Sequence, residues 1–182
     1  LPPRSTPLYS SAAADVYKRQ GNGGSGIVVM RYEWKSPAPT WYGNRGVWGG
    51  GSNGGPYEDT IDYVTISITG NATDFGNLSD ARQYTAACSN GSRGVFGGGD
   101  SGPKLNVIDY ITIATTGNAT DFGDLNNSVE GAGSCSSSVR GLFAGGTGQI
   151  NVIDYVTIAS TGNATDFGDL TDGRKDLTGS SD

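Results

Sequence analysis

Three short, mostly apolar segments of the chain, at 61–66, 108–113 and 153–158, have nearly the same sequence and carry an aspartate at the second position. The surrounding segment 106–114 is rich in β-branched and aromatic residues and contains neither Gly nor Pro, which favours a β-strand. Successive side chains of a strand point to opposite faces of its sheet. One face therefore carries Val107, Asp109, Ile111 and Ile113, and the other carries Ile108, Tyr110 and Thr112. Both faces are mostly apolar, so we expect other parts of the protein to cover both of them.

Three sequence motifs recur in the same order in three copies. An Arg-Gly motif that ends in small residues begins at Arg45, Arg93 and Arg140. The mostly apolar segment follows, at 61–66, 108–113 and 153–158. The motif Gly-Asn-Ala-Thr-Asp-Phe-Gly then begins at Gly70, Gly117 and Gly162, which are 47 and then 45 residues apart. Such a period is typical of an array of small structural units. We place these units at about 45–92, 93–139 and 140–182, within a repeat region of 41–182.

Each repeat is interpreted as four short strands. In the second repeat we expect strands at 93–96, 106–114 and 119–123, and the segment 83–89 supplies a further strand to the first repeat. Glycine, proline and asparagine mark the turns between them. The chain contains 31 glycines, which disfavour helices. The sequence therefore predicts an all-β fold.

The repeats resemble the blades of kelch-type β-propellers, whose units are about fifty residues long. The likeness lies in a glycine doublet that ends one strand, a tyrosine on the next strand, and an aromatic residue on the returning strand. The doublets are Gly49-Gly50, Gly97-Gly98 and Gly145-Gly146, the tyrosines are Tyr63, Tyr110 and Tyr155, and Phe75, Phe122 and Phe167 replace the usual Trp. The resemblance implies about three four-stranded blades of an incomplete propeller, because propellers close with about four to eight blades. We therefore expect a longer natural protein or pairing between copies of this chain.

An arginine and an aspartate recur in each repeat and are predicted to have a structural role. Asp62, Asp109 and Asp154 lie on an otherwise apolar strand face, where a buried carboxylate needs a partner. We expect it to accept hydrogen bonds from the repeated arginines, which are Arg45, Arg93 and Arg140, or from nearby backbone N–H groups. An aspartate in a strand-end turn is the alternative.

The first forty residues differ from the repeats in composition. Residues 1–20 are interpreted as a non-native or disordered segment, because SSAAADVYKRQ resembles the translated adapter sequence found at the ends of assembled metagenomic reads. Residues 21–32 resemble the last strand of Gly-rich domains in phage tail and fibre proteins. Together with the Pro-containing linker at 35–40, they form the predicted segment 21–40.

The composition argues against most kinds of chemistry. The chain has no histidine, which excludes Ser-His-Asp triads, Cys-His pairs and His-based metal centres. The Asp121–Asp124 pair and its copies fit Asx turns better than a calcium site. Cys88 and Cys135 lie at equivalent places in consecutive repeats and are interpreted as two small buried thiols, with a disulfide as the alternative. We expect no enzymatic activity, no metal and no cofactor.

Charge and hydropathy restrict the partners. The net charge is −6 with only 12 Lys and Arg residues, so we expect no binding to nucleic acid. The sequence contains no apolar run of the roughly 20 residues that a membrane-spanning helix needs, so we expect no membrane insertion. The Asn-Ala-Thr sequons at Asn71, Asn118 and Asn163 are better explained by turn geometry than by glycosylation.

The resemblances together suggest a non-enzymatic binding or structural module of a phage tail or fibre, located in the virion and in contact with a host surface. Its partners would be other virion proteins or a host-surface glycan or protein. The alternative is a bacterial secreted or cell-surface propeller that mediates protein–protein interaction. Loops that follow the glycine clusters differ most between repeats and are the candidate contact surface. Their candidate binding residues are Ser52, Asn53, Tyr57, Asp100, Lys104 and Gln149.

Overall fold

A computed structural model describes residues 43–181 of the protein. Within this range the chain forms eleven β-strands and no helix, which confirms the all-β prediction. The same residues include no helix long and apolar enough to span a membrane. The predictions for segments 1–20 and 21–40 lie outside the described residues.

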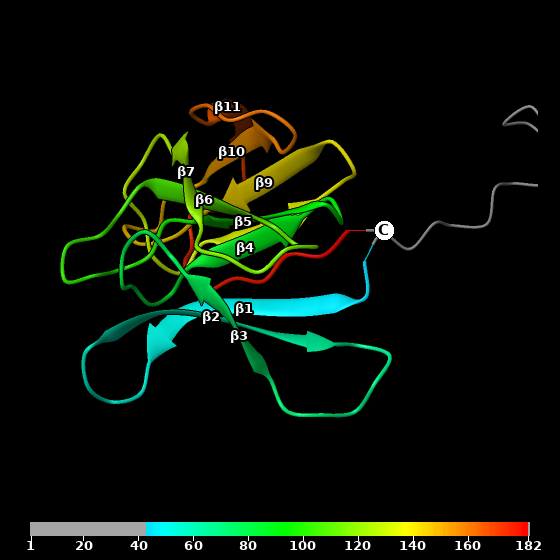
Figure 1. The fold of residues 1–182 in the computed structure, drawn as a ribbon. Coiled ribbons are helices and arrows are strands. Elements are labelled where there is room, and N and C mark those ends of the chain that lie inside the picture. Colours follow the sequence, from blue (N-terminus) through cyan, green and yellow to red (C-terminus); the bar gives the residue numbers. More distant parts are fainter. Residues whose placement is uncertain (1–42, 182) are drawn as a thin grey trace, which may run out of the picture. The chain divides into compact units, whose positions relative to one another are not determined.

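The strands form three antiparallel sheets, and consecutive strands are neighbours in each (Figure 1). The first sheet contains β1 (Arg45–Ser52), β2 (Tyr57–Thr65) and β3 (Thr73–Asn77). The second contains β4 (Ala86–Ser89), β5 (Arg93–Gly97), β6 (Val107–Thr112) and β7 (Thr120–Asp124). The third contains β8 (Gly133–Ser136), β9 (Arg140–Ala144), β10 (Val152–Thr157) and β11 (Thr165–Asp169).

The segment expected to complete the first repeat belongs instead to the second sheet. β4 begins at Ala86, and its residues pair with β5, from Ala86 opposite Gly97 to Ser89 opposite Gly94. β8 pairs with β9 in the same way, so the final strand of one sequence repeat starts the next sheet. The first sheet consequently has three strands, and the expectation of four strands holds for the second and third sheets.

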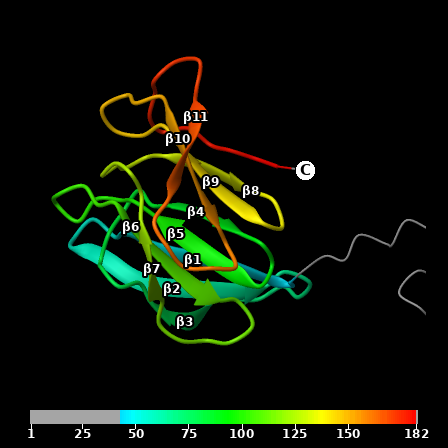
Figure 2. The same ribbon diagram turned by 90° about the horizontal axis from the view of Figure 1, so that it is seen from above.

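The second sheet lies between the other two (Figures 1 and 2). On one of its faces, Ile111 and Ile113 pack in a core with Ile61 and Phe75 of the first sheet. On the opposite face, Ile108 packs in a core that includes Phe143, Val156 and Ile158 of the third sheet. The prediction that both faces of β6 are covered is therefore confirmed. Within residues 43–181 the three sheets do not close into a ring.

A β-bulge in the outer strand of each sheet places the repeated phenylalanine. The register between β6 and β7 shifts after Ile108, so Phe122 is the extra residue between Asp121 and Gly123. Its ring meets the ring of Tyr110 edge to face, with 5.9 Å between the centroids. The first and third sheets repeat this geometry at centroid separations of 5.8 and 6.0 Å. The repeated Tyr and Phe thus join the last two strands of each sheet.

At the same position in each glycine cluster, one glycine allows a loop of the same repeat to approach the strand closely. Gly50, Gly98 and Gly145 have φ angles of 74°, 66° and 67°, in the left-handed region that L side chains avoid. A Cβ on Gly98 would lie 2.5 Å from the backbone oxygen of Val129. The following residue, Gly99, donates its N–H to that same oxygen at 2.8 Å. Glycine is therefore required where the loop crosses the end of the sheet.

Candidate functional site

The loops that follow β1 and β5 meet at Asp100. The backbone N–H and carbonyl groups of Gln83 and Asp100 form a reciprocal pair of hydrogen bonds, at 3.0 and 2.9 Å. The hydroxyl of Tyr57 lies 3.5 Å from Oδ2 of Asp100, a long contact that joins the first sheet to the second. The negative charge of Asp100 is the main reason why the pKa of Tyr57 is raised. Two of the six candidate binding residues are thereby brought together.

The loops that follow β5 and β9 meet at Glu130. Its Oε1 lies 3.7 Å from Nζ of Lys104 and accepts a hydrogen bond from Oγ1 of Thr147 at 3.0 Å. The Thr147 hydroxyl also donates to the Glu130 backbone oxygen at 3.2 Å. Lys104 is therefore connected through Glu130 to the loop that carries Gln149. Gln149 itself is exposed and has a positive φ of 54°.

Ser52 and Asn53 lie in the first of these loops and bond only to nearby residues. The Asn53 side chain donates to Oε1 of Glu58 at 2.7 Å and accepts from the N–H of Gly55 at 3.1 Å. The Ser52 hydroxyl accepts from the N–H of Gly54 at 3.4 Å. These contacts hold the shape of the β1–β2 hairpin and leave both residues exposed.

Gln83 and Glu130 are contact residues of this surface that the sequence reasoning did not single out. They occupy the same position in consecutive repeats, five residues after the buried Leu78 and Leu125. The sequence signal that could have identified them is a polar residue at the same distance from a core leucine in two repeats. We name the region formed by the loops 52–57, 100–104 and 147–151, together with Gln83 and Glu130, the loop surface.

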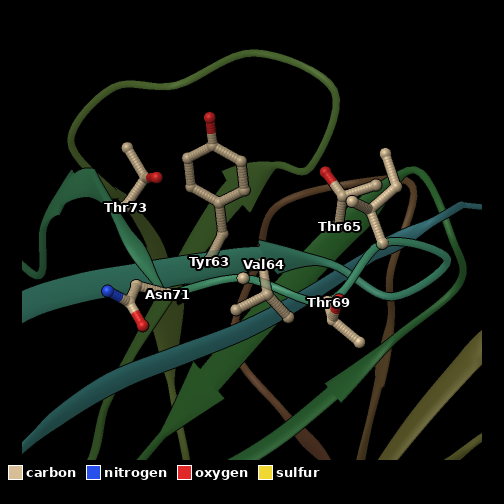
Figure 3. A pocket seen from close by; sticks show the side chains of 8 residues that line it. Tyr63, Val64, Thr65, Thr69, Asn71 and Thr73 are labelled. Atoms are coloured by element: carbon tan, nitrogen blue, oxygen red, sulfur yellow. The ribbon is translucent and has the colours of Figure 1, made fainter.

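A shallow hollow lies away from the loop surface, between β2 and the segment that leads to β3 (Figure 3). Tyr63, Val64, Thr65, Thr69, Asn71 and Thr73 line it. Its lining combines hydroxyl and apolar groups, and it contains no carboxylate, amine or thiol. Within residues 43–181, no three His, Cys, Asp or Glu side chains form a group that could hold a metal ion.

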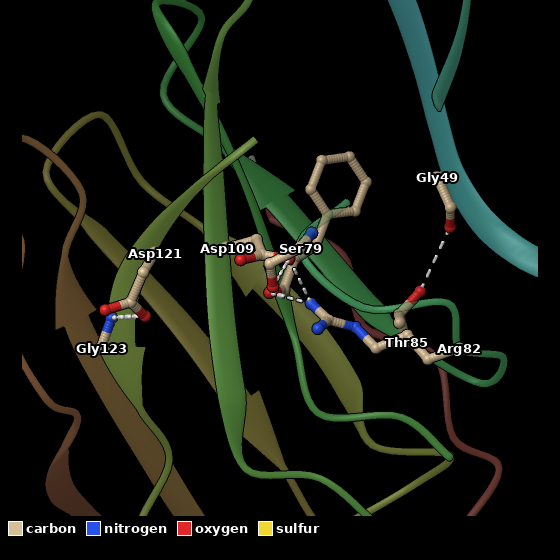
Figure 4. Close-up of polar contacts among 8 residues, drawn as sticks. Gly49, Ser79, Arg82, Thr85, Asp109, Asp121 and Gly123 are labelled. Atoms are coloured by element: carbon tan, nitrogen blue, oxygen red, sulfur yellow. Dashed lines mark hydrogen bonds and ion pairs between the residues drawn. The ribbon is translucent and has the colours of Figure 1, made fainter. Parts of the chain in front are cut away.

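The repeated arginines do not pair with the repeated aspartates, so the first of the two expected kinds of donor is not found, whereas the second, backbone N–H, is found. Asp109 is fully buried and accepts hydrogen bonds from the N–H and hydroxyl of Ser79, at 3.0 and 2.9 Å (Figure 4). Its Oδ2 also lies 3.0 Å from Nη2 of the fully buried Arg82. Burial lowers the pKa of Arg82, and the charge of Asp109 opposes that shift. Backbone N–H was the correct part of the expectation, but it comes from the preceding repeat.

Asp154 has the same place in the third sheet and a different set of donors. It accepts from the N–H of Asn126 at 3.0 Å and from its side-chain amide at 2.6 Å. Val129 stands where the first repeat has Arg82. Asp154 is only 5% exposed. Like Asp109, it accepts hydrogen bonds from the preceding repeat and so connects its sheet to that repeat. Asp62 in the first sheet is half-buried.

The repeated arginines stack on the repeated tyrosines instead. The guanidinium carbons of Arg45, Arg93 and Arg140 lie 4.6, 4.5 and 4.4 Å from the ring centroids of Tyr63, Tyr110 and Tyr155. Nη1 of Arg45 donates to the backbone oxygen of Ile113 at 2.8 Å, and Nη1 of Arg93 donates to that of Ile158 at 3.2 Å. A planar guanidinium can stack on an aromatic ring and donate hydrogen bonds at the same time. Arg45 and Arg93 do both, and their hydrogen bonds join one repeat to the next.

Backbone hydrogen bonds connect the outer strands of consecutive sheets. Gly117 and Ala119 donate to the backbone oxygens of Phe75 and Asn77, both at 2.7 Å. The Asn118 side-chain oxygen accepts from the N–H of Asn77 at 3.1 Å. Gly162, Asn163 and Ala164 make the same three contacts with Phe122 and Asp124. Two of the three sequon asparagines, Asn118 and Asn163, thus accept a hydrogen bond from the backbone of the preceding repeat.

The inner strands of the second and third sheets are also joined side by side. The hydroxyls of Ser134 and Ser136 donate to the backbone oxygens of Ala87 and Ser89 at 2.6 and 2.7 Å. Cys88 and Cys135 are free thiols at the same level, which agrees with their interpretation as two thiols. Burial raises the pKa of Cys88 to about 12, and the nearby Cys135 adds to this shift. The Cys88 thiol is therefore a poor nucleophile at neutral pH.

The sequence matches no protein-family model and no curated protein. The resemblance to kelch blades accordingly depends on the repeated motifs themselves.

Proposed function

We propose that this chain is a non-enzymatic binding or structural module, in which stacked sheets of a kelch-like propeller hold the loop surface in place. The observation that carries the proposal is the contrast between junctions and loops. The same backbone contacts join the second sheet to the first and the third sheet to the second. The loops that follow the glycine clusters differ in sequence from repeat to repeat. Constant junctions with variable loops are typical of scaffolds that present a recognition surface.

The chemistry of the loop surface favours a polar contact. Tyr57 supplies an aromatic ring with a hydroxyl, Asp100 and Glu130 supply carboxylates, and Lys104 supplies a cation. Such groups suit a glycan, whose hydroxyls need donors and acceptors and whose ring packs on an aromatic face, or a polar protein surface. We extend the proposal to a phage tail or fibre that contacts a host surface, which is supported by the motif at 21–32 alone.

Binding assays with loop variants test the proposal. The full chain is applied to an array of purified bacterial surface polysaccharides and to whole bacterial cells. We expect Tyr57→Ala and Lys104→Ala each to weaken binding about tenfold or more, as residues central to a contact do. Thr116→Ala is the matched control, because it is exposed in the turn before Gly117, outside the loop surface.

Equal binding by the wild type, the loop variants and the control would contradict the assignment of the loop surface. A lack of binding to both polysaccharides and cells, together with capture of a purified tail protein, would support the structural alternative within the same proposal. Hydrolysis of a polysaccharide by the purified chain would overturn it.

A further inference from the structure

The two ends of the stack of sheets expose side chains that are buried at the junctions inside it. In the first sheet, Trp48 is 59% exposed and Ile66 is 67% exposed, whereas their counterparts Phe96 and Ile113 are 3% and 8% exposed. In the third sheet, Phe167 is 52% exposed, whereas its counterpart Phe75 is 3% exposed. We name the first surface the head face (Trp48, Asp62, Val64, Ile66 and 70–72) and the second the tail face (Phe167, Leu170, Thr171 and Arg174).

We propose that the head face of one copy of this chain binds the tail face of another copy. The proposal goes beyond the loop surface and does not depend on what that surface binds. Its basis is that each face carries the residues that meet at the junctions within the chain. At the first junction, Phe96, Ile111 and Ile113 of the second sheet pack against Ile61, Phe75 and Leu78 of the first repeat. The head face presents Trp48, Val64 and Ile66 at the three equivalent positions.

The charged groups of the two faces are complementary. Asp62 on the head face is the counterpart of Asp109, which is paired with Arg82 and Ser79. Thr171 and Arg174 on the tail face are the counterparts of Ser79 and Arg82. The backbone confirms this equivalence, because Arg174 accepts from the N–H of Gly146 at 2.9 Å as Arg82 accepts from that of Gly51 at 2.8 Å. An exposed Arg174 is therefore positioned to meet Asp62 of a second copy.

The backbone edges are complementary as well. The outer strand β11 is the counterpart of β3 and β7. In β3 and β7, the backbone oxygens of the phenylalanine and of the residue two positions later accept hydrogen bonds from a Gly-Asn-Ala segment of the next repeat. The first repeat carries that segment at 70–72, where Gly70, Asn71 and Ala72 are exposed. Among residues 43–181, no strand of the first sheet corresponds to the inner strands β4 and β8 of the other two sheets. Residues 178–181 are the counterpart of those strands, and a Cβ on Gly179 would meet Ser134 of β8.

Because the two faces differ, the contact is head to tail. Such an interface either closes into a ring or extends as a chain of copies. In both cases each copy uses one head face and one tail face, so blocking either face on all copies prevents assembly.

Mass measurement by analytical ultracentrifugation over a wide concentration range tests the proposal. We expect the wild type to form assemblies of two or more copies. Ile66→Asp blocks the head face and Phe167→Asp blocks the tail face, and each should weaken self-association at least about thirtyfold. Val139→Asp is the matched control, because Val139 is 57% exposed and belongs to neither face.

Mixing the two blocked variants provides the decisive measurement. Ile66→Asp retains an intact tail face and Phe167→Asp retains an intact head face, so the mixture should form a one-to-one heterodimer that grows no further. A monomeric wild type at all concentrations would overturn the proposal. Self-association by either blocked variant alone, with the strength of the wild type, would also overturn it. Far-ultraviolet circular dichroism establishes that each variant is folded, as expected for substitutions at exposed positions.

Discussion

A buried aspartate occupies the same position in the second and third sheets, but the groups that donate hydrogen bonds to it differ between the two sheets. Asp109 has a buried arginine and a serine as donors, and Asp154 has one asparagine that supplies two N–H groups. Oδ1 of Asp109 and two nitrogens of Arg82 have no hydrogen-bond partner within the described part of the chain. The ion pair at the first junction is thus incompletely satisfied, although both of its members are fully buried.

Exchange of the two arrangements tests the role of the buried pair. Arg82→Val introduces the residue of the next repeat and leaves Asp109 without its cation, so we expect a loss of about 3–5 kcal/mol in the free energy of unfolding. Adding Ser79→Asn keeps the backbone donor and replaces the hydroxyl donor with a side-chain amide like that of Asn126. The number of hydrogen bonds to Asp109 is unchanged, so we expect it to recover no more than about 1 kcal/mol. Urea denaturation measures both. A single variant as stable as the wild type would show that the ion pair is dispensable.

The residue pairs also show what the sequence could predict and what it could not. A carboxylate on an apolar strand face predicts burial and a need for donors. Both are found at Asp109 and Asp154, whereas Asp62 is half-buried. The identity of the donors was not predictable from the repeats, because Arg82 is replaced by Val129 in the next copy. Conversely, the arginines that do recur were assigned to the aspartates because charge suggested a pair. Their actual contacts are an aromatic ring and, for Arg45 and Arg93, a carbonyl in the following repeat.

Loops contact the ends of strands closely at the glycine doublets. The loop that leaves the outer strand crosses the end of the sheet and accepts hydrogen bonds from the strand-end backbone, as Val129 does from Gly99. The motif is of the kind that allows a close approach, because glycine has no Cβ. It did not predict which segment approaches, because the partner lies about thirty residues further along the chain and its own sequence varies from repeat to repeat. The sheet to which β4 belongs was missed for a different reason: β4 pairs with β5, the next strand along the chain, and the repeat boundary at Arg93 separates the two.

Gly98→Ala tests this account of the doublet. The added Cβ would lie 2.5 Å from the Val129 oxygen at a φ of 66°, so we expect a loss of at least about 2 kcal/mol in the free energy of unfolding. Gly70→Ala is the control, measured at a concentration where the chain is monomeric, because no atom of the same chain lies within 4 Å of its added Cβ. It should change the stability by no more than about 0.5 kcal/mol. Equal effects of the two substitutions in thermal and urea unfolding would contradict the account.

At the scale of the whole molecule, the three sheets differ in how much of their surface is covered. The second sheet packs on both faces, whereas the first and third sheets each contribute to one of the two cores. In arrays of this kind, each unit gains stability mainly from its immediate neighbours. The stack should therefore be most stable at its centre and least stable at its ends.

Amide hydrogen exchange measures this gradient. The central strands β2, β6 and β10 have nearly the same sequence and each has a neighbour on both sides, so their amides are directly comparable. At a concentration where the chain is monomeric, we expect slower exchange in β6 than in β2 or β10, because only β6 lies in a sheet covered on both faces. Uniform exchange in all three strands would indicate that the sheets open together and would contradict the gradient.

The offset between the sequence repeat and the sheet has a consequence for how such arrays grow. The end of each repeat supplies β4 or β8 to the sheet that follows, so a gene duplication that copies one repeat transfers strands of two adjacent sheets at once. The inserted copy begins by completing a sheet of its upstream neighbour and ends by starting one for its downstream neighbour. Lengthening the gene by whole repeats therefore preserves every strand pairing, wherever within the repeat the recombination breakpoint falls.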